Sequence, residues 1–125
     1  MKKILIIEDE PALREALADK LSREGFSCLE AKNGLEGLDF ALKEHPDLIL
    51  LDIIMPVMDG MTMLEELRKN PWGKNVPVIL LTNLSEVEKV AESLRHGIYD
   101  YLVKSDWSLE DIVKKVKGKL GLVEF

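Results

Sequence analysis

Short runs of aliphatic residues recur along the chain with few polar positions inside them. The strongest are 4–7 (Ile-Leu-Ile-Ile), 48–51 (Leu-Ile-Leu-Leu) and 76–81, and the segments 26–31 and 99–103 are weaker versions. Continuous apolar runs of this length are typical of strands that are buried on both faces of a parallel sheet. The pattern therefore predicts five strands.

Stretches with helical periodicity separate these runs. In each of them apolar residues recur every three or four positions, and most intervening positions are charged. The five apolar stripes comprise Leu13, Ala16, Leu17 and Leu21; Leu35, Leu38, Ala41 and Leu42; Met63, Leu64 and Leu67; Val87, Val90, Ala91 and Leu94; and Leu109, Ile112, Val113 and Val116. Each stripe predicts a helix that lays one apolar face on the sheet.

Residues that favour helix ends flank several of these stretches. Pro11 suits the first turn of a helix. The segments 85–88 (Ser-x-x-Glu) and 108–111 (Ser-x-x-Asp) have the pattern of capping boxes. Gly25 and Gly97 follow apolar stripes, where a left-handed residue often ends a helix.

Strand and helix alternate five times, which predicts an α/β fold of the three-layer, doubly wound (βα)5 type. Right-handed crossovers then place helices on both faces of an open, five-stranded parallel sheet. A length of 125 residues without repeats or linkers predicts a single domain over residues 1–125, with its core at about 2–120. In such sheets the functional groove lies at the carboxyl ends of the strands.

The composition narrows the classes of function. A net charge of −6, from 17 basic and 23 acidic residues, argues against direct nucleic-acid binding by this chain, which would need a basic face. No apolar run approaches the roughly 18 residues of a membrane span, and the first residues lack the features of a secretion signal. The single cysteine, Cys28, excludes an intrachain disulfide. We therefore expect a cytoplasmic protein without a membrane partner.

Chemically active side chains follow four of the predicted strands. Three acids, residues 8–10, follow the first strand, Asp52 ends the third, Thr82 ends the fourth, and the fifth runs into Lys104. These residues should converge on one edge of the sheet, because the carboxyl ends of parallel strands meet there. Packed carboxylates repel each other, and Mg²⁺ would relieve the repulsion. With the ammonium and the hydroxyl group they predict a phosphoryl site around a carboxylate nucleophile.

At these positions the sequence resembles the receiver domains of two-component response regulators, the CheY-like family. The stretch Asp52–Gly60 (Asp-Ile-Ile-Met-Pro-Val-Met-Asp-Gly) resembles the phosphoacceptor loop of that family. The acidic pair Glu8–Asp9, the hydroxyl residue Thr82, the lysine Lys104 and the aromatic residue Tyr101 match its other site positions. The resemblance spans essentially the whole chain.

The resemblance implies a fold, a reaction and a switch. The sheet would have the strand order 2-1-3-4-5 of flavodoxin-like and CheY-like folds. Asp52 would accept a phosphoryl group from a sensor histidine kinase or a histidine phosphotransfer protein, which makes the chain a signalling phosphoacceptor and not an enzyme. Thr82 and Lys104 would bind the phosphoryl oxygens. Thr82 and Tyr101 would switch the face formed by the fourth helix, the fifth strand and the fifth helix.

The resemblance also implies a metal site. Mg²⁺ would be held by Asp9, Asp52 and the backbone carbonyl of Ile54, with Glu8 bound directly or through water. A homodimer that forms through the switched face upon phosphorylation is a further expectation.

Some alternatives stay open at this point. Ser105 follows Lys104 where the family usually has a proline, which leaves the shape of the output face undetermined. The main alternative function is an interaction module that keeps the fold and signals without phosphorylation. A flavodoxin-like carrier is disfavoured because residues 8–10 would repel a flavin phosphate, and a nucleotide hydrolase because Gly-x-x-x-x-Gly-Lys is missing. A haloacid-type phosphatase needs a second aspartate where Ile54 stands.

Overall fold

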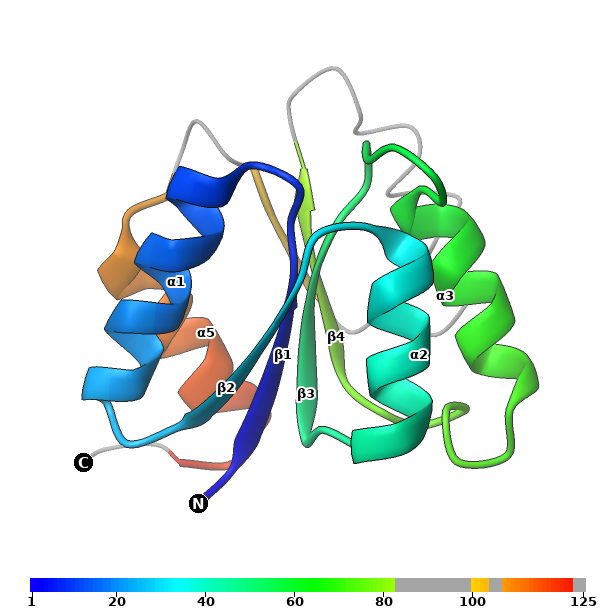
Figure 1. Cartoon of the computed structure of the whole chain (residues 1–125). Helices are drawn as coiled ribbons and strands as arrows, with labels where there is room; N and C mark the ends of the chain where they lie inside the picture. Colours follow the sequence, from blue (N-terminus) through cyan, green and yellow to red (C-terminus); the bar gives the residue numbers. More distant parts are fainter. Residues whose placement is uncertain (83–99, 104–106, 123–125) are drawn as a thin grey trace.

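A five-stranded parallel sheet forms the centre of the molecule (Figure 1). The computed structural model describes residues 1–82, 100–103 and 107–122. In chain order the elements are β1 Lys3–Ile7, α1 Pro11–Arg23, β2 Ser27–Ala31, α2 Gly34–Glu44, β3 Leu48–Asp52, α3 Gly60–Lys69, β4 Val78–Thr82, β5 Asp100–Val103 and α5 Leu109–Lys119.

The strands follow the order β2-β1-β3-β4-β5, and every pairing is parallel. Helices α1 and α5 cover one face of the sheet, and α2 and α3 cover the other (Figure 1). The predicted doubly wound α/β fold and its strand order are therefore confirmed. The chain runs outward from β1 to β2 and returns to β3 on the other side of β1, so the topological switch point lies between β1 and β3.

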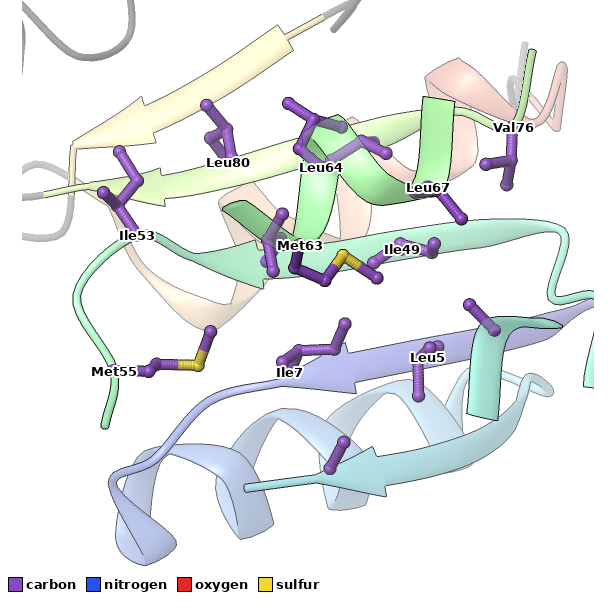
Figure 2. Close-up of a cluster of buried hydrophobic side chains, with 14 residues drawn as sticks. Leu5, Ile7, Ile49, Ile53, Met55, Met63, Leu64, Leu67, Val76 and Leu80 are labelled. Carbon is purple, nitrogen blue, oxygen red and sulfur yellow. The ribbon is translucent and has the colours of Figure 1, made fainter. Parts of the chain in front are cut away.

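The central strands are buried on both faces, which explains why their sequences are continuous apolar runs. Leu5 and Ile7 of β1 point into a cluster on the α2 and α3 face (Figure 2), whereas Ile4 and Ile6 point into a cluster on the α1 and α5 face. All four side chains are fully buried. The sheet thus forms a rigid base for the residues at its carboxyl edge.

Helix α2 buries only part of the apolar stripe that its sequence predicts. Leu35 is 52% exposed and Leu42 is 36% exposed, although both belong to the apolar stripe expected to face the sheet. Of that stripe Ala41 is buried and Leu38 is partly buried against the same cluster, and the helix also buries Gly34 and Gly37. A side chain at Gly37 would collide with Ile7 of β1, so the small residues allow the helix to lie close to the sheet. The prediction for the two leucines was wrong for this reason.

The predicted helix ends agree with the structure wherever it describes them. Pro11 is the first residue of α1, and Gly25 has a φ of 93° just after that helix. Ser108 and Asp111 form a reciprocal capping box at the start of α5. The fourth predicted helix, the segment 85–88 and Gly97 lie outside the described residues. None of the helices in the described ranges has the length and the apolar character needed to cross a membrane.

Candidate functional site

Two adjacent strands bring three carboxylates to the carboxyl edge of the sheet. Ile7 of β1 is in register with Leu51 of β3, so Glu8 and Asp52, the residues that follow, lie side by side at the switch point. Asp9 comes next along the turn that leads into α1. The sequence predicted this convergence from the ends of the first and third apolar runs, and it is confirmed for these three residues.

The three side chains lie close enough to bind one ion. One carboxylate oxygen from each of Glu8, Asp9 and Asp52 lies within 4.8 Å of the others. Glu8 is fully buried and Asp52 is 5% exposed, whereas Asp9 faces solvent. The cluster therefore combines two buried acids with one acid that is open to an incoming ion.

This donor set fits a hard divalent cation. Mg²⁺ binds oxygen ligands at about 2.0–2.1 Å, so two oxygens on one ion can be at most roughly 4.2 Å apart. The observed spacing of up to 4.8 Å needs only small side-chain rotations to meet that limit. The cation would also offset the mutual repulsion of the three carboxylates, which is strongest for the buried pair.

The turn that carries Glu8 and Asp9 is held from several sides. The Glu8 amide donates to the carbonyl oxygen of Ala31 at the end of β2 at 3.0 Å. The Glu8 Oε2 accepts a hydrogen bond from the Asp9 amide at 3.0 Å. The Glu8 carbonyl oxygen accepts one from Nη1 of Arg14 at 2.9 Å, and Nε of Arg14 lies 3.5 Å from Oε1 of Glu30.

Sequence reasoning missed Arg14. The available signal was a cation near the start of a helix, where the helix dipole disfavours positive charge. A cation at this unfavourable position indicates that a nearby hydrogen-bond acceptor compensates for the cost, and here the acceptor is the carbonyl oxygen of Glu8.

The loop after Asp52 folds back on the end of β3. The Gly60 amide donates to the carbonyl oxygen of Ile53 at 2.8 Å, and a side chain at Gly60 would collide with the carbonyl oxygen of Asp52. Asp59 caps α3 by accepting a hydrogen bond from the amide of Thr62 at 2.8 Å. This close approach explains the glycine that ends the loop motif and fixes the backbone around Asp52.

One residue of the same loop has an unfavourable backbone conformation. Val57 has a φ of 69°, a region that β-branched residues rarely adopt. It forms the middle of a γ-turn in which the Met58 amide donates to the carbonyl oxygen of Pro56 at 2.8 Å. Its side chain is 76% exposed, so packing does not explain the conformation.

The remaining predicted site residues are only partly placed. Thr82 is the last residue of β4, one position beyond Leu81, which is in register with Asp52. Tyr101 lies in β5, in register with Leu80. The side chains of both residues, and all of Lys104, lie outside the described part of the chain. Ile54 follows β3 with its side chain 48% exposed.

Comparisons with known proteins agree on one family. The sequence model of the family described as "Response regulator receiver domain" matches residues 4–117. Sporulation initiation phosphotransferase F from Bacillus subtilis is 36% identical over 121 residues, which cover 97% of this chain and 95% of that protein. A probable transcriptional regulator, ycf27, from Porphyridium aerugineum is 37% identical over 98% of this chain but only 50% of its own length. The chain thus spans about half the length of several curated relatives.

Solved structures agree with the sequence matches. The signal receiver domain of a histidine kinase from Syntrophus aciditrophicus superposes with a TM-score of 0.87 at 35% identity, covering 99% of this chain and 93% of that one. The chemotaxis protein CheY4 of Vibrio cholerae gives a TM-score of 0.88 at 30% identity, covering 96% of this chain and 99% of that one. The chain belongs to the response regulator receiver domains, the CheY-like domains of two-component signalling systems.

Proposed function

We propose that Asp52 is the phosphoacceptor of this receiver domain and that its phosphorylation depends on Mg²⁺. The observation that carries the proposal is the carboxylate cluster of Glu8, Asp9 and Asp52, with oxygens within 4.8 Å of one another at the carboxyl edge of the sheet. An interaction module that works without phosphate would have no use for three acids that repel each other.

In the proposed reaction an oxygen of the Asp52 carboxylate attacks the phosphorus atom of a phosphohistidine. The new bond joins oxygen to phosphorus, the bond from phosphorus to the imidazole nitrogen breaks, and the imidazole leaves and takes up a proton from solvent. Asp52 is the last residue of a fully buried strand, so its carboxylate is held at a defined position for attack. Hydrolysis of the resulting acyl phosphate by water returns the carboxylate and inorganic phosphate.

The chain offers ligands for the metal and for the phosphoryl oxygens. Bound Mg²⁺ supplies charge neutralisation between the carboxylates and the phosphoryl oxygens. Glu8, Asp9, Asp52 and the backbone carbonyl of Ile54 would hold it. In the same proposal Thr82 and Lys104 bind the phosphoryl oxygens from the β4 and β5 side, as the family resemblance implies.

The proposed donor is a sensor histidine kinase or a histidine phosphotransfer protein. The proposed switch couples Thr82 to Tyr101 and alters the face that includes β5 and α5, through which two copies would then associate. We assign residues 1–125 to one receiver domain in the cytoplasm. Two relatives that are about twice as long as this chain are described as transcriptional regulators. For a longer protein that contains this domain we therefore propose the regulation of transcription as the output.

The test uses a small phosphodonor, acetyl phosphate, with Mg²⁺ and intact-mass measurement. The wild-type chain should gain the mass of one phosphoryl group, whereas Asp52→Asn and a sample with EDTA should gain none. Asp59→Asn is the matched control, because Asp59 is an exposed acid of the same loop and asparagine still caps α3. A label that persists on Asp52→Asn, or a wild-type chain that stays unmodified with Mg²⁺, would refute the proposal.

A further inference from the structure

Arg14 lies at the start of α1, just after the turn that carries Glu8 and Asp9, and its side chain reaches back to that turn. Nη1 donates to the carbonyl oxygen of Glu8 at 2.9 Å, and Nε lies 3.5 Å from Oε1 of Glu30. The Arg14 side chain is only 17% exposed, whereas Glu30 is 42% exposed, so the guanidinium is largely shielded from water and its partner is not.

The contacts of Arg14 complete a closed circuit around the acidic turn. The carbonyl of Glu8 is held by Arg14, and the amide of Glu8 is held by the carbonyl oxygen of Ala31 at 3.0 Å. Ala31 is the neighbour of Glu30 on β2, and Glu30 pairs with Arg14. We call these four residues, Glu8, Arg14, Glu30 and Ala31, the Arg14 clasp; it joins the ends of β1 and β2 to α1.

The start of α1 makes this clasp more important. Glu10, the N-cap residue of α1, makes no side-chain capping bond. A side-chain cap usually fixes the turn before a helix, so here the turn gains no such support. The hydrogen bond from the side chain of Arg14, within α1, to the carbonyl oxygen of Glu8 holds the turn in place of a cap.

We infer that Arg14 is a positioning residue for the metal site: its fork fixes the backbone at Glu8, and thereby sets Glu8 and Asp9 at the spacing that a divalent cation requires. This inference rests on the proposed Mg²⁺-dependent phosphorylation of Asp52. Arg14 does not touch the metal or the phosphoryl group in this proposal. It acts through the backbone of Glu8.

The charge of Arg14 and its positioning role predict opposite effects of its removal on Mg²⁺ affinity, and this makes the inference testable. A guanidinium group near the carboxylates repels a cation, so removing its charge should strengthen Mg²⁺ binding if charge alone matters. If position matters, removing the side chain should weaken Mg²⁺ binding. Arg14→Lys separates the two effects further, because lysine keeps the charge but its single nitrogen cannot hold Glu8 and Glu30 as the fork does.

The experiment measures Mg²⁺ affinity directly, by titration calorimetry, on the wild type, Arg14→Met and Arg14→Lys. Arg23→Met is the matched control: Arg23 lies on the same helix and pairs with Asp19 at 3.2 Å, but its side chain is 76% exposed and it is the last residue of α1, at the opposite end from the acidic turn. Residues that orient metal ligands from outside typically change metal affinity 10- to 100-fold. We expect both Arg14 variants to bind Mg²⁺ about tenfold more weakly, and Arg23→Met to bind like the wild type.

Phosphorylation by acetyl phosphate gives a second readout. The Mg²⁺ concentration for half-maximal labelling should rise by a similar factor in Arg14→Met, while the labelling rate at saturating Mg²⁺ should stay close to that of the wild type. Should Arg14→Met fail to fold, Glu30→Gln replaces it, because removing the charge of Glu30 weakens the contact that aims the guanidinium at the carbonyl of Glu8; its Mg²⁺ affinity should also fall.

The outcomes separate the two proposals. Unchanged or tighter Mg²⁺ binding in Arg14→Met, or an equal loss in Arg23→Met, overturns the role of Arg14, even if the wild type is phosphorylated normally. A wild type that binds Mg²⁺ but never gains phosphate overturns the proposed function and leaves the affinity comparison intact.

Discussion

Replacing Asp52 by asparagine should stabilise the metal-free protein, because the substitution removes one of three clustered negative charges. Two unit charges 4.8 Å apart repel each other by about 3.5 kcal/mol at an effective dielectric constant of about 20. Glu8 and Asp52 are both buried, so their repulsion is screened less than that of exposed pairs.

The net gain should be smaller than this upper value. Asp52 takes part in further polar interactions, and asparagine weakens some of them. Solvent around the exposed Asp9 also screens its share of the repulsion. We therefore expect Asp52→Asn to raise the free energy of unfolding in EDTA by about 1–2 kcal/mol.

Mg²⁺ should cancel or reverse the stability difference between Asp52→Asn and the wild type. A cation that binds the folded chain alone adds about 2.7 kcal/mol of stability when its concentration is 100 times its dissociation constant. The wild type should receive most of this gain, whereas Asp52→Asn has lost one charged ligand and should gain less. The two unfolding curves should thus approach each other or cross as Mg²⁺ is added.

The assay is urea unfolding of both chains, followed by circular dichroism, in EDTA and at saturating Mg²⁺. A gain of 1–2 kcal/mol corresponds to a rise of about 1 M in the urea midpoint for a domain of this size. Asp59→Asn, an exposed acid in the same loop, should change neither curve appreciably. A less stable Asp52→Asn in EDTA, or an equal gain in Asp59→Asn, would show that repulsion within the cluster is not the cause.

Three other features give further predictions. Val57→Gly should raise stability by about 1 kcal/mol, because glycine relieves the positive φ of 69° at an exposed position; Val57→Ala, which keeps the strain, should not do so in urea unfolding. Arg68→Met should lower stability by about 2–3 kcal/mol in thermal unfolding, since its Nη1 donates to two loop carbonyls at 2.7 and 2.8 Å, whereas Lys69→Met on the exposed side should be nearly neutral. Hydrogen bonds from the backbone and then the side chain of Ser108 hold the pKa of Asp111 below its ordinary value. The stabilisation that comes from the lowered pKa is fully present above the ordinary pKa of Asp111 and is lost as the pH falls through the lowered pKa. Asp111→Asn should therefore be less stable than the wild type at pH 7 and equal to it in strong acid.

The sequence predicted the sheet and the acidic cluster because both depend on strong, simple signals. A strand buried on both faces must be apolar throughout, so its end is visible as the first charged residue, and this rule located Glu8 and Asp52. The carboxyl ends of parallel strands must also share one edge, which placed them together. No pairwise contact had to be known for either step.

The features that the sequence did not reveal depend on distances between elements. The apolar stripe of α2 predicted that Leu35 and Leu42 face the sheet, but the helix turns Gly37 toward Ile7 of β1 and the two leucines lie on the surface. Apolar periodicity does not reveal that small residues can form the contact face where a helix lies close to its sheet. The contact between Arg14 and the carbonyl of Glu8 likewise depends on the exact course of a turn.

Two unfavourable features of the molecule lie at the edge of the sheet where the proposed chemistry takes place. The carboxylates repel each other, and Val57 has a strained backbone five residues after Asp52. The stability of the sheet, whose central strands are buried on both faces, compensates for both energetic costs. Strain and like charge that persist beside a well-packed core are typical of functional sites, because a chain selected for stability alone would lose them. If Asp52→Asn and Val57→Gly each stabilise the metal-free chain, their effects should also nearly add, since one acts on charge and the other on backbone conformation. A double variant that gains much less than the sum would mean instead that the loop conformation at Val57 is set by the charge on Asp52.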